Sequence, residues 1–404
     1  MTPTATRSIT QLTGQLAHKR VLVRVDFNVP TDADGQITDD TRIQMALDTI
    51  RFLQREQARI ILISHRGRPN GQVVERDRFT VVANQLSRLL GDPVIYVAAG
   101  IQDADTQSVL ADLADGEVML LENCRFDPRE TTNDPDFAKE LASIADVYVM
   151  DAFGTAHRAH ASTVGVAAYL PSYTGCLMDN ELSALSAVVS GDKRPVVAII
   201  GGAKISTKIG VLEHLLGTVD VLIVGGGMVF TLLSADGCEI GKSLFEADKL
   251  DVAISFLQKA RTSSTRLILA TDFVCAPEFS ESVDCIIVDK MSIPKSHMGL
   301  DIGPETVKQI CQEIDHASVI VWNGPMGVFE MPTYAAGTLA VAQAVANSDA
   351  FSVVGGGDSV AAINQANLGS HISHISTGGG ACLELLEGRV LPAVAAIQQS
   401  PLLS

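Results

Sequence analysis

Short apolar runs alternate with longer amphipathic stretches along the whole 404-residue chain. Runs of Val, Ile and Leu predict strands buried on both faces, whereas residues 40–56 and 80–91 have the apolar spacing of amphipathic helices. The expected strands are residues 21–27, 59–64, 94–97, 118–122, 147–151, 196–200, 221–224, 266–270, 285–288, 319–322, 351–354 and 371–376. Because parallel strands need a crossover helix, the alternation predicts an α/β protein with two doubly wound, Rossmann-like parallel sheets.

A change of pattern near residues 171–195 predicts the boundary between two domains. Residues 171–175 are rich in turn formers, residues 177–190 have the pattern of one helix, and residues 191–195 again favour a turn. We therefore expect a first domain over residues 1–175 and a second over residues 176–388, which begins with a helical hinge. The tail, residues 389–404, is apolar enough to dock back on the first domain.

Composition and charge exclude several classes of protein. Hydrophobic residues make up 47% of the chain and charged residues 19%, which excludes global disorder. The net charge of −17 argues against nucleic-acid binding over a broad surface. The same charge repels anionic ligands, so a phosphorylated substrate would need a local basic pocket.

Cysteine usage and the N-terminal sequence predict a cytoplasmic protein. The seven cysteines are dispersed and include no C-x-x-C pair, so neither a zinc ribbon nor a redox dithiol is indicated. Residues 1–14 lack the apolar segment of a secretory signal. A run of the ~18 apolar residues that a membrane-spanning helix needs is also absent from the sequence.

Basic and polar side chains follow the expected strands of the first half. They occupy residues 24–28, 65–69, 122–126 and 151–160, and Arg42 follows in the turn 39–42. One arginine of this kind is ordinarily a solvated or salt-bridged surface group. The same chemistry at four strand ends instead predicts one crevice that binds a small ligand with phosphate, carboxylate and hydroxyl groups, since ligands bind at the carboxyl ends of such strands.

Glycine follows the expected strands of the second half. It is concentrated at residues 201–202, 225–227, 324, 355–357 and 378–380. Glycine lets a backbone approach closely, and helix N-termini offer N–H groups to phosphate oxygens, so the pattern indicates a nucleotide site, although such triplets also make tight turns. A P-loop is not indicated, because Asp236 stands where the motif needs its first glycine before Gly241. The three possible dinucleotide-binding fingerprints also fail, because Phe230, Val360 and Leu383 stand where the last glycine is needed.

Charged residues near these glycines are candidates for phosphate chemistry. Lys204 and Lys208 have i,i+4 spacing on an expected helix after Gly202 and could neutralise a phosphoryl group. Asp358 either caps the next helix or holds Mg²⁺. Glu330 is either a ribose ligand or a surface carboxylate. The histidine pairs 157/160 and 371/374 have no Cys or carboxylate cluster beside them, so zinc is not expected.

Nine segments, in this order, resemble the phosphoglycerate kinase family. They are RVDFNVP (24–30), HRGRP (65–69), LENCRF (121–126), DAFGTAHRAHAST (151–163), GGAKISTK (201–208), MGLDIGP (298–304), WNGPMGVFE (322–330), GGGDS (355–359) and STGGGACLELLEG (376–388). The resemblance implies a two-domain, cytoplasmic monomer that closes about a hinge. It also implies reversible phosphoryl transfer between 1,3-bisphosphoglycerate and ADP, which gives 3-phosphoglycerate and ATP, with Mg²⁺ as cofactor.

The same resemblance implies roles for individual residues. The acid substrate would contact Asp26, Phe27, Asn28, Arg42, His65, Arg66, Gly67, Arg68, Arg125 and Arg158. The nucleotide would contact Lys208, Gly299, Asn323, Glu330, Gly356, Gly357, Asp358, Ser359, Gly378, Gly379 and Gly380. Arg42, Lys204 and Lys208 would act in catalysis, and Asp358 would hold the Mg²⁺ ion.

Some positions depart from the family pattern, and two other functions have to be weighed. Arg66 stands where leucine is frequent, Cys124 where valine is usual, Asn180 where lysine is frequent, and Ser359 where threonine is frequent. None of these changes removes a group that phosphoryl transfer needs. The alternatives are an NAD-type oxidoreductase, which the broken fingerprints oppose, and a catalytically silent binding relative, which the intact lysines oppose.

Overall fold

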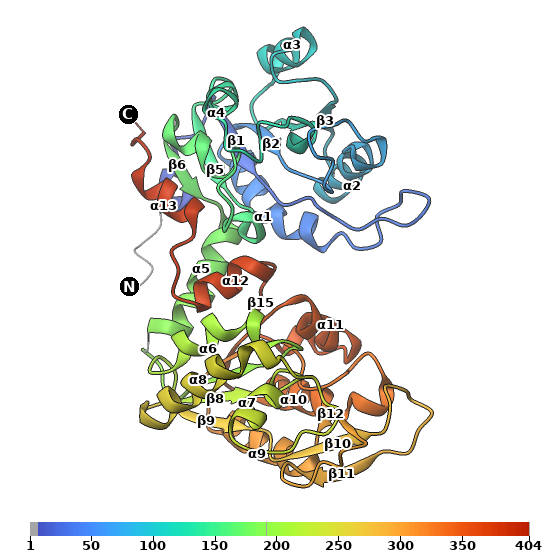
Figure 1. Ribbon diagram of the computed structural model, residues 1–404. Helices are drawn as coiled ribbons and strands as arrows, with labels where there is room; N and C mark the ends of the chain where they lie inside the picture. Colours follow the sequence, from blue (N-terminus) through green and yellow to red (C-terminus); the bar gives the residue numbers. More distant parts are fainter. Residues whose placement is uncertain (1–6, 191, 404) are drawn as a thin grey trace. The chain divides into compact units, whose positions relative to one another are not determined.

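The computed structural model describes residues 7–190 and 192–403 (Figure 1). The described residues form two compact units, one of residues 7–182 and 390–403 and the other of residues 183–389. Helix α5 (Cys176–Ser190) runs from the first unit into the second. Residues 1–6 of the expected first domain, Gly191 of the expected turn and Ser404 of the expected tail lie outside the described residues.

The first unit is built on a parallel sheet. In its described residues six strands pair in the order β3-β4-β2-β1-β5-β6. The strands are β1 (Arg20–Arg24), β2 (Arg59–Ile63), β3 (Val94–Val97), β4 (Val118–Leu121), β5 (Val147–Met150) and β6 (Ser172–Thr174). Arg24 pairs with Ile63 of β2 and with Met150 of β5, so the carboxyl ends of three strands lie at one edge. Ligands of open α/β sheets bind at such an edge.

Amphipathic helices enclose this sheet. Helix α1 buries Ile43, Ala46, Ile50 and Leu53 against the core, at the spacing that the sequence predicted. The helices are α1 (Thr41–Arg55), α2 (Thr80–Leu90), α3 (Ala104–Asp112), α4 (Pro135–Ala142) and α13 (Pro392–Gln399). Short 3₁₀ helices are η1 (Ile9–Leu12), η2 (Glu75–Asp77), η3 (Cys124–Phe126), η4 (Phe153–Thr155) and η5 (Gly165–Ala168).

The C-terminal segment packs within the first unit. Helix α13 contacts η5 and strand β6, and Figure 1 shows it, in red, beside β6. The Ala393 N–H donates to the Ala156 carbonyl at 3.2 Å, and the Arg7 guanidinium donates to the Ser400 carbonyl at 3.0 Å. The two ends of the described chain are therefore joined by hydrogen bonds.

The second unit also contains a parallel sheet, so the expected α/β class with two such sheets is confirmed. Six of its described strands pair in the order β15-β14-β13-β7-β8-β9. They are β7 (Val196–Ile200), β8 (Val221–Val224), β9 (Arg266–Leu269), β13 (Val319–Asn323), β14 (Phe351–Gly355) and β15 (His374–Ile375). Asn323 pairs with both Ile200 and Gly355, so three strand ends again meet at one edge.

A separate antiparallel sheet was not predicted. In the described residues it has three strands in the order β11-β10-β12, which are β10 (Asp272–Ala276), β11 (Ile286–Asp289) and β12 (Met298–Ile302). The sequence placed residues 285–288 among the strands of the parallel sheet. They instead form an edge strand whose Ile287 side chain is 61% exposed, and such exposure does not fit a strand buried on both faces.

The helices of the second unit connect its strands. They are α6 (Ile209–Leu215), α7 (Val229–Ala235), α8 (Leu250–Thr262), α9 (Pro304–Asp315), α10 (Ala336–Asn347), α11 (Gly357–Gln365) and α12 (Gly379–Leu386), with η6 (Ile205–Thr207), η7 (Ala247–Lys249), η8 (Pro332–Tyr334) and η9 (Gly369–His371). Lys204 and Lys208 do not share one α-helix, contrary to the prediction. Lys204 has extended backbone before η6, and Lys208 directly precedes α6.

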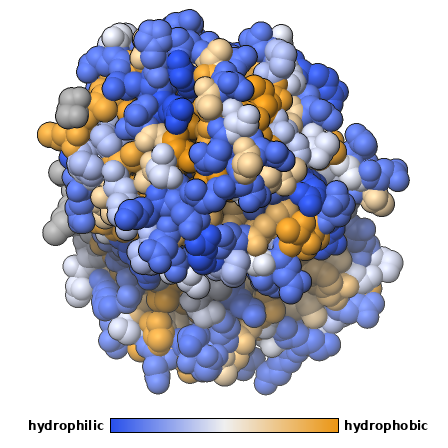
Figure 2. All heavy atoms as spheres, turned by 90° about the horizontal axis from the view of Figure 1, so that it is seen from above, coloured by the Kyte–Doolittle hydropathy of each residue, from blue (hydrophilic) through white to orange (hydrophobic). Residues whose placement is uncertain are grey.

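The surface is mainly hydrophilic where Figure 2 shows it. On the face shown in Figure 2, hydrophilic side chains predominate and apolar ones form small groups between them. Among the residues that the structure describes, no helix combines the length and the apolar character needed to cross a membrane.

Candidate functional site

The charges of four arginines act on His65 at the carboxyl edge of the first sheet. His65 follows β2 and is 4% exposed. Burial, and then the charges of Arg24, Arg125, Arg158 and Arg42, hold the pKa of His65 well below its ordinary value of 6.5. The charges that act on His65 come from β1, η3, the segment after η4 and α1, so residues distant in sequence converge here as the strand-end rule predicted.

Hydrogen bonds between strand-end loops fix the positions of these side chains. The Arg42 guanidinium donates to Asp26 Oδ2 at 2.9 Å, and the Gly67 N–H donates to Asn28 Oδ1 at 2.9 Å. Arg125 Nη1 donates to the Gly67 carbonyl at 2.8 Å. Arg125 Nε is buried and has no hydrogen-bond partner in the described part of the chain. An orphaned buried donor of this kind is suited to an oxygen atom of a ligand.

The remaining expected acid-site residues differ in their surroundings. The Arg66 guanidinium donates to the Arg78 carbonyl at 2.9 Å and to the Thr31 hydroxyl at 3.0 Å, so it is engaged with the protein itself. Arg68 is exposed. Phe27 is buried and its N–H donates to Ser64 Oγ at 2.8 Å, so Phe27 positions the loop through its backbone.

A buried carboxyl directly after β5 predicts that the stability of the first unit depends on pH. Asp151 is fully buried, and burial raises its pKa to about 7, although the Met178 N–H donates to Oδ1 at 3.1 Å. The pKa of aspartate in unfolded chains is about 3.9. Between these two values the folded chain keeps a proton that the unfolded chain has lost, so stability falls as the pH rises.

We expect Asp151→Asn to reveal this dependence, because asparagine keeps the neutral shape at every pH. The free energy of unfolding of the wild type, relative to that of the variant, should be highest below about pH 4. That advantage should decline by at most about 4 kcal/mol as the pH rises to 7. Urea unfolding of both proteins over a pH series measures the difference, and a difference independent of pH would contradict the assignment.

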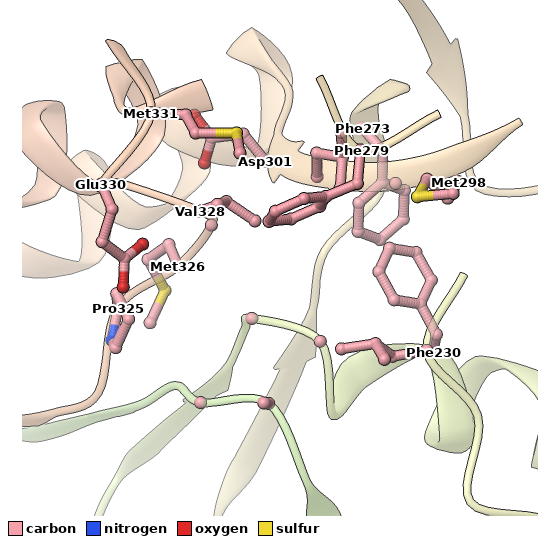
Figure 3. A pocket seen from close by; sticks show the side chains of 18 of the residues that line it. Phe230, Phe273, Phe279, Met298, Asp301, Pro325, Met326, Val328, Glu330 and Met331 are labelled. Carbon is pink, nitrogen blue, oxygen red and sulfur yellow. The ribbon is translucent and has the colours of Figure 1, made fainter. Parts of the chain in front are cut away.

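The second unit contains a cavity of about 650 Å³, the size of a small-molecule site. Figure 3 shows Phe230, Phe273 and Phe279 gathered at one side of the cavity and Glu330 at the other. Further lining residues are Gly202, Gly226, Gly227, Gly299, Pro325, Met326, Val328 and Asp358. One side of the cavity is therefore suited to a planar apolar group, and the glycine side to groups that approach a backbone closely.

Lys208 lies beside Asn323 at the carboxyl end of β13. Asn323 is 1% exposed, and its Oδ1 accepts a hydrogen bond from the Lys208 ammonium. Burial lowers the pKa of Lys208, whereas the charges of Cys382 and Asp358 raise it. Asn323 Nδ2 is buried and has no partner among the described residues, so it is a second orphaned donor at a strand end.

The other residues expected to bind the nucleotide lie in the turns and helix starts that follow the strands of the second sheet. Ser359 Oγ accepts the Gly324 N–H at 2.5 Å, so this hydroxyl connects two turns. Gly356 has φ +91° and precedes α11, whose first turn carries Gly357 and Asp358. Gly378, Gly379 and Gly380 begin α12, the helix that carries Cys382. Lys204 is exposed.

Sequence reasoning did not predict the burial of Asp301 or of Arg24, although both lie in segments that it singled out. Asp301 lines the cavity, accepts the Gly337 N–H at 2.7 Å, and has its pKa raised by burial to about 7. Arg24 is fully buried against His65. Arg24 follows apolar residues in a predicted strand, and nothing in the local sequence indicates which residues contact it in the folded chain. The motif that contains Asp301 was recognised, but nothing local marked its carboxyl as buried.

No group of three or more His, Cys, Asp or Glu side chains in the described residues could hold a metal ion. This finding does not concern a metal held jointly by one carboxylate and the phosphates of a bound nucleotide, which is the usual arrangement for Mg²⁺.

Comparisons with known proteins agree with this architecture. The family model described as phosphoglycerate kinase matches residues 9–389. A phosphoglycerate kinase of Synechococcus elongatus is 51% identical over 399 residues, which cover 98% of this chain and 99% of that protein. One of Roseiflexus sp. is 53% identical over 385 residues, which cover 95% and 97%.

Solved structures give the same result. The phosphoglycerate kinase structure from Coxiella burnetii has a TM-score of 0.91 and 42% identity, and the match covers 98% of this chain and 99% of that one. The structure of the Pyrococcus horikoshii enzyme has a TM-score of 0.81 and 32% identity, with 97% and 98% covered. A family match over nearly the whole sequence and a shared fold lead to one conclusion: the chain belongs to the phosphoglycerate kinase family.

Proposed function

We propose that the arginine cluster around His65 binds 3-phosphoglycerate and that the glycine-lined cavity of the second unit binds the nucleotide. The reaction of the family is reversible phosphoryl transfer between 1,3-bisphosphoglycerate and ADP, a transferase step of glycolysis. The observation that carries the proposed site is the arrangement of Arg24 against the buried His65 and of Arg125, with its unpartnered Nε, against Gly67 of the same loop. An otherwise acidic chain needs such a focused positive field to attract an anionic acid.

The acid site has chemically distinct parts. We propose that three arginines bind the phosphate and carboxylate groups of the acid, namely Arg42, Arg125 and Arg158. A guanidinium binds such oxygens bidentately. Asp26 and Asn28 are candidates for the glycerate hydroxyl, which needs an acceptor as well as a donor. Arg66 is already bonded to the protein, so we assign it a supporting role.

The nucleotide site follows the shape of the cavity. The aromatic side suits a base, and Glu330 suits the ribose hydroxyls because a carboxylate accepts their hydrogen bonds. The glycines that precede α11 and α12 suit the phosphates, which approach the backbone closely at helix N-termini. Asn323 Nδ2 is an available donor for a phosphate oxygen.

Phosphoryl transfer needs positioning and electrostatic stabilisation more than covalent chemistry. Lys208 is suited to stabilise the charge that develops on the transferring group, and Arg42 to face it from the acid site. No general base is needed, because the attacking carboxylate is already ionised. The substrates must meet in line, and the hinge closure expected from the resemblance stays a prediction.

Asp358 is the residue that we propose for Mg²⁺. It is exposed in the first turn of α11 and lines the cavity, so one carboxylate is available beside the proposed phosphate position. Mg²⁺ is commonly bound by one or two carboxylates together with substrate phosphates, so the residues present fit this ion. The bound ion would neutralise phosphate charge. From the resemblance we also propose a cytoplasmic monomer.

The decisive assay is ATP-dependent phosphorylation of 3-phosphoglycerate, followed by reductive trapping of the acyl phosphate. We expect turnover that requires added Mg²⁺ and disappears with a chelator. Arg42→Met should raise the KM for 3-phosphoglycerate by about 10- to 100-fold, since it removes a charged hydrogen-bond donor. Arg51→Met on the same helix is the control, because Arg51 donates to the Leu89 carbonyl away from the strand ends. Folded wild-type protein without turnover would overturn the proposed function.

A further inference from the structure

A buried polar relay lies behind the proposed acid site. Arg24 and Glu130 both have 0% exposure, and Ser162 connects them. Arg24 Nε donates to Ser162 Oγ at 2.9 Å, and the same hydroxyl donates to Glu130 Oε1 at 2.6 Å. The Ser162 N–H donates to Glu130 Oε2 at 2.9 Å. Buried charged groups need hydrogen-bond partners, and the Ser162 hydroxyl supplies one to each of these two groups of opposite sign.

The free end of Arg24 contacts the imidazole of His65. Arg24 Nη2 lies 3.0 Å from His65 Nδ1. A guanidinium has five N–H donors and no acceptor, so His65 Nδ1 must accept this hydrogen bond with its lone pair. An imidazole that accepts at Nδ1 and is neutral carries its single proton on Nε2. The hydrogen bond therefore determines which ring nitrogen holds the proton.

The surroundings of His65 also favour the neutral ring. Its desolvation and four arginine charges all disfavour a further positive charge, which is why its pKa lies well below the ordinary value. Glu130, the buried carboxylate of the relay, lies on the far side of Ser162 and makes its hydrogen bonds there. His65 therefore differs from its neighbours: the arginines supply charge, whereas the histidine supplies a directed polar group.

We propose that Arg24, held by Ser162 and Glu130, is a positioning residue that fixes His65 as the neutral Nε2–H tautomer and so makes it a hydrogen-bond donor to the bound acid. The opposite tautomer would direct a lone pair at the ligand and repel its oxygen atoms. The consequence for the substrate rests on the proposed acid site. The tautomer itself does not depend on that assignment.

The first experiment reads the tautomer directly in the full-length wild type. A long-range ¹H–¹⁵N spectrum distinguishes a protonated ring nitrogen from one with a free lone pair, and His65→Gln assigns the signals. We expect a protonated Nε2 and an unprotonated Nδ1 at neutral pH. A doubly protonated ring, or a proton on Nδ1, would overturn the proposal without any variant of the relay.

The second experiment removes the donor to Nδ1. Arg24→Met should give a mixture of tautomers and raise the KM for 3-phosphoglycerate by about 10- to 100-fold, with little change in the KM for ATP. Arg24→Lys retains a cationic donor and should recover part of the loss. Ser162→Ala keeps both charges but removes the hydroxyl that connects them. This variant replaces Arg24→Met in the experiment if Arg24→Met does not fold. It should shift the tautomer equilibrium in the same direction.

The pattern of results separates the possible failures. Equal rises in both KM values, without a change of tautomer and without rescue by lysine, would mean that Arg24 only supports the fold. An unchanged KM for 3-phosphoglycerate in a variant whose tautomer has changed would also overturn the proposal. Wild-type protein that lacks turnover but has the expected tautomer would overturn the proposed function and leave the Arg24–His65 assignment standing.

Discussion

Lys208→Met should lower kcat by about 10³-fold with only a modest change in the KM for the nucleotide. Methionine keeps the length of the side chain and removes its charge. The lysine ammonium is held by Asn323 Oδ1 at a carboxyl strand end, in a half-buried position where electrostatic interactions are stronger than in bulk water. Charge spreads over the transferring phosphoryl group in the transition state, so a cation there stabilises that state more than the bound substrate.

Steady-state kinetics in both substrates and a thermal unfolding curve measure this effect. Lys259→Met is the matched control, because Lys259 lies on α8 and pairs with Glu213 on the surface. The control should retain wild-type kcat. A Lys208→Met enzyme with unchanged kcat would remove Lys208 from catalysis, and equal loss in both variants would point to a general effect of lost positive charge.

The convergence of the acid-site residues could be predicted because topology determines it. Parallel strands place their carboxyl ends at one edge, so reading the residues after β1, β2 and β4 was sufficient to bring Asp26, His65 and Arg125 together. The same rule located the turns at Gly202, Gly226 and Gly324 in the second sheet. Their roles in binding stay predictions, because they concern ligands and not the arrangement of the chain.

The errors arose where tertiary context outweighs local pattern. Residues 286–289 are rich in β-branched side chains, and that pattern does not distinguish a parallel strand from an antiparallel edge strand such as β11. Lys204 and Lys208 have helical spacing, yet the chain leaves β7 through the turn at Gly202, with φ +129°, and η6 before α6 begins. The spacing of two lysines does not reveal that a turn and a 3₁₀ helix lie between the strand and the helix.

Arg24 illustrates a further limit of sequence reasoning. Its position just before Val25 and Asp26 marks it as the end of a strand, and arginine there is ordinarily a surface residue. Its actual environment depends on Ser162 and Glu130, which are more than 100 positions away. Only the folded chain shows that this arginine is enclosed and that it contacts a histidine.

Gly324→Ala should both destabilise the second unit and disable the enzyme. A Cβ atom at Gly324 would lie 2.2 Å from the Gly201 carbonyl oxygen, and its φ of +99° is unfavourable for alanine. The contact between the added Cβ atom and the Gly201 carbonyl can be relieved only if the carboxyl ends of β7 and β13 separate. We expect a loss of about 3–5 kcal/mol, from overpacking together with backbone strain.

Gly237→Ala is the matched control because it shares the strain and lacks the clash. Gly237 has φ +90°, and a Cβ atom there would meet no heavy atom within 4 Å. Its cost should be about 1–2 kcal/mol. Urea unfolding followed by the fluorescence of Trp322, the single tryptophan, reports both variants from the buried core of this unit. Equal losses in the two variants would show that the strand ends accommodate the methyl group.

The loss of activity in Gly324→Ala should exceed what unfolding explains. Gly324 follows Asn323, whose side chain holds Lys208, and the Gly324 N–H donates to Ser359 Oγ. Displacement of this turn therefore moves the orphaned Asn323 amide and the Lys208 ammonium together. Misplacement by about 1 Å can cost about 10²-fold in rate, so we expect a loss of that size in kcat under conditions where the variant remains folded. A folded Gly324→Ala enzyme with wild-type kcat would show that transfer does not depend on the close approach of these two strand ends.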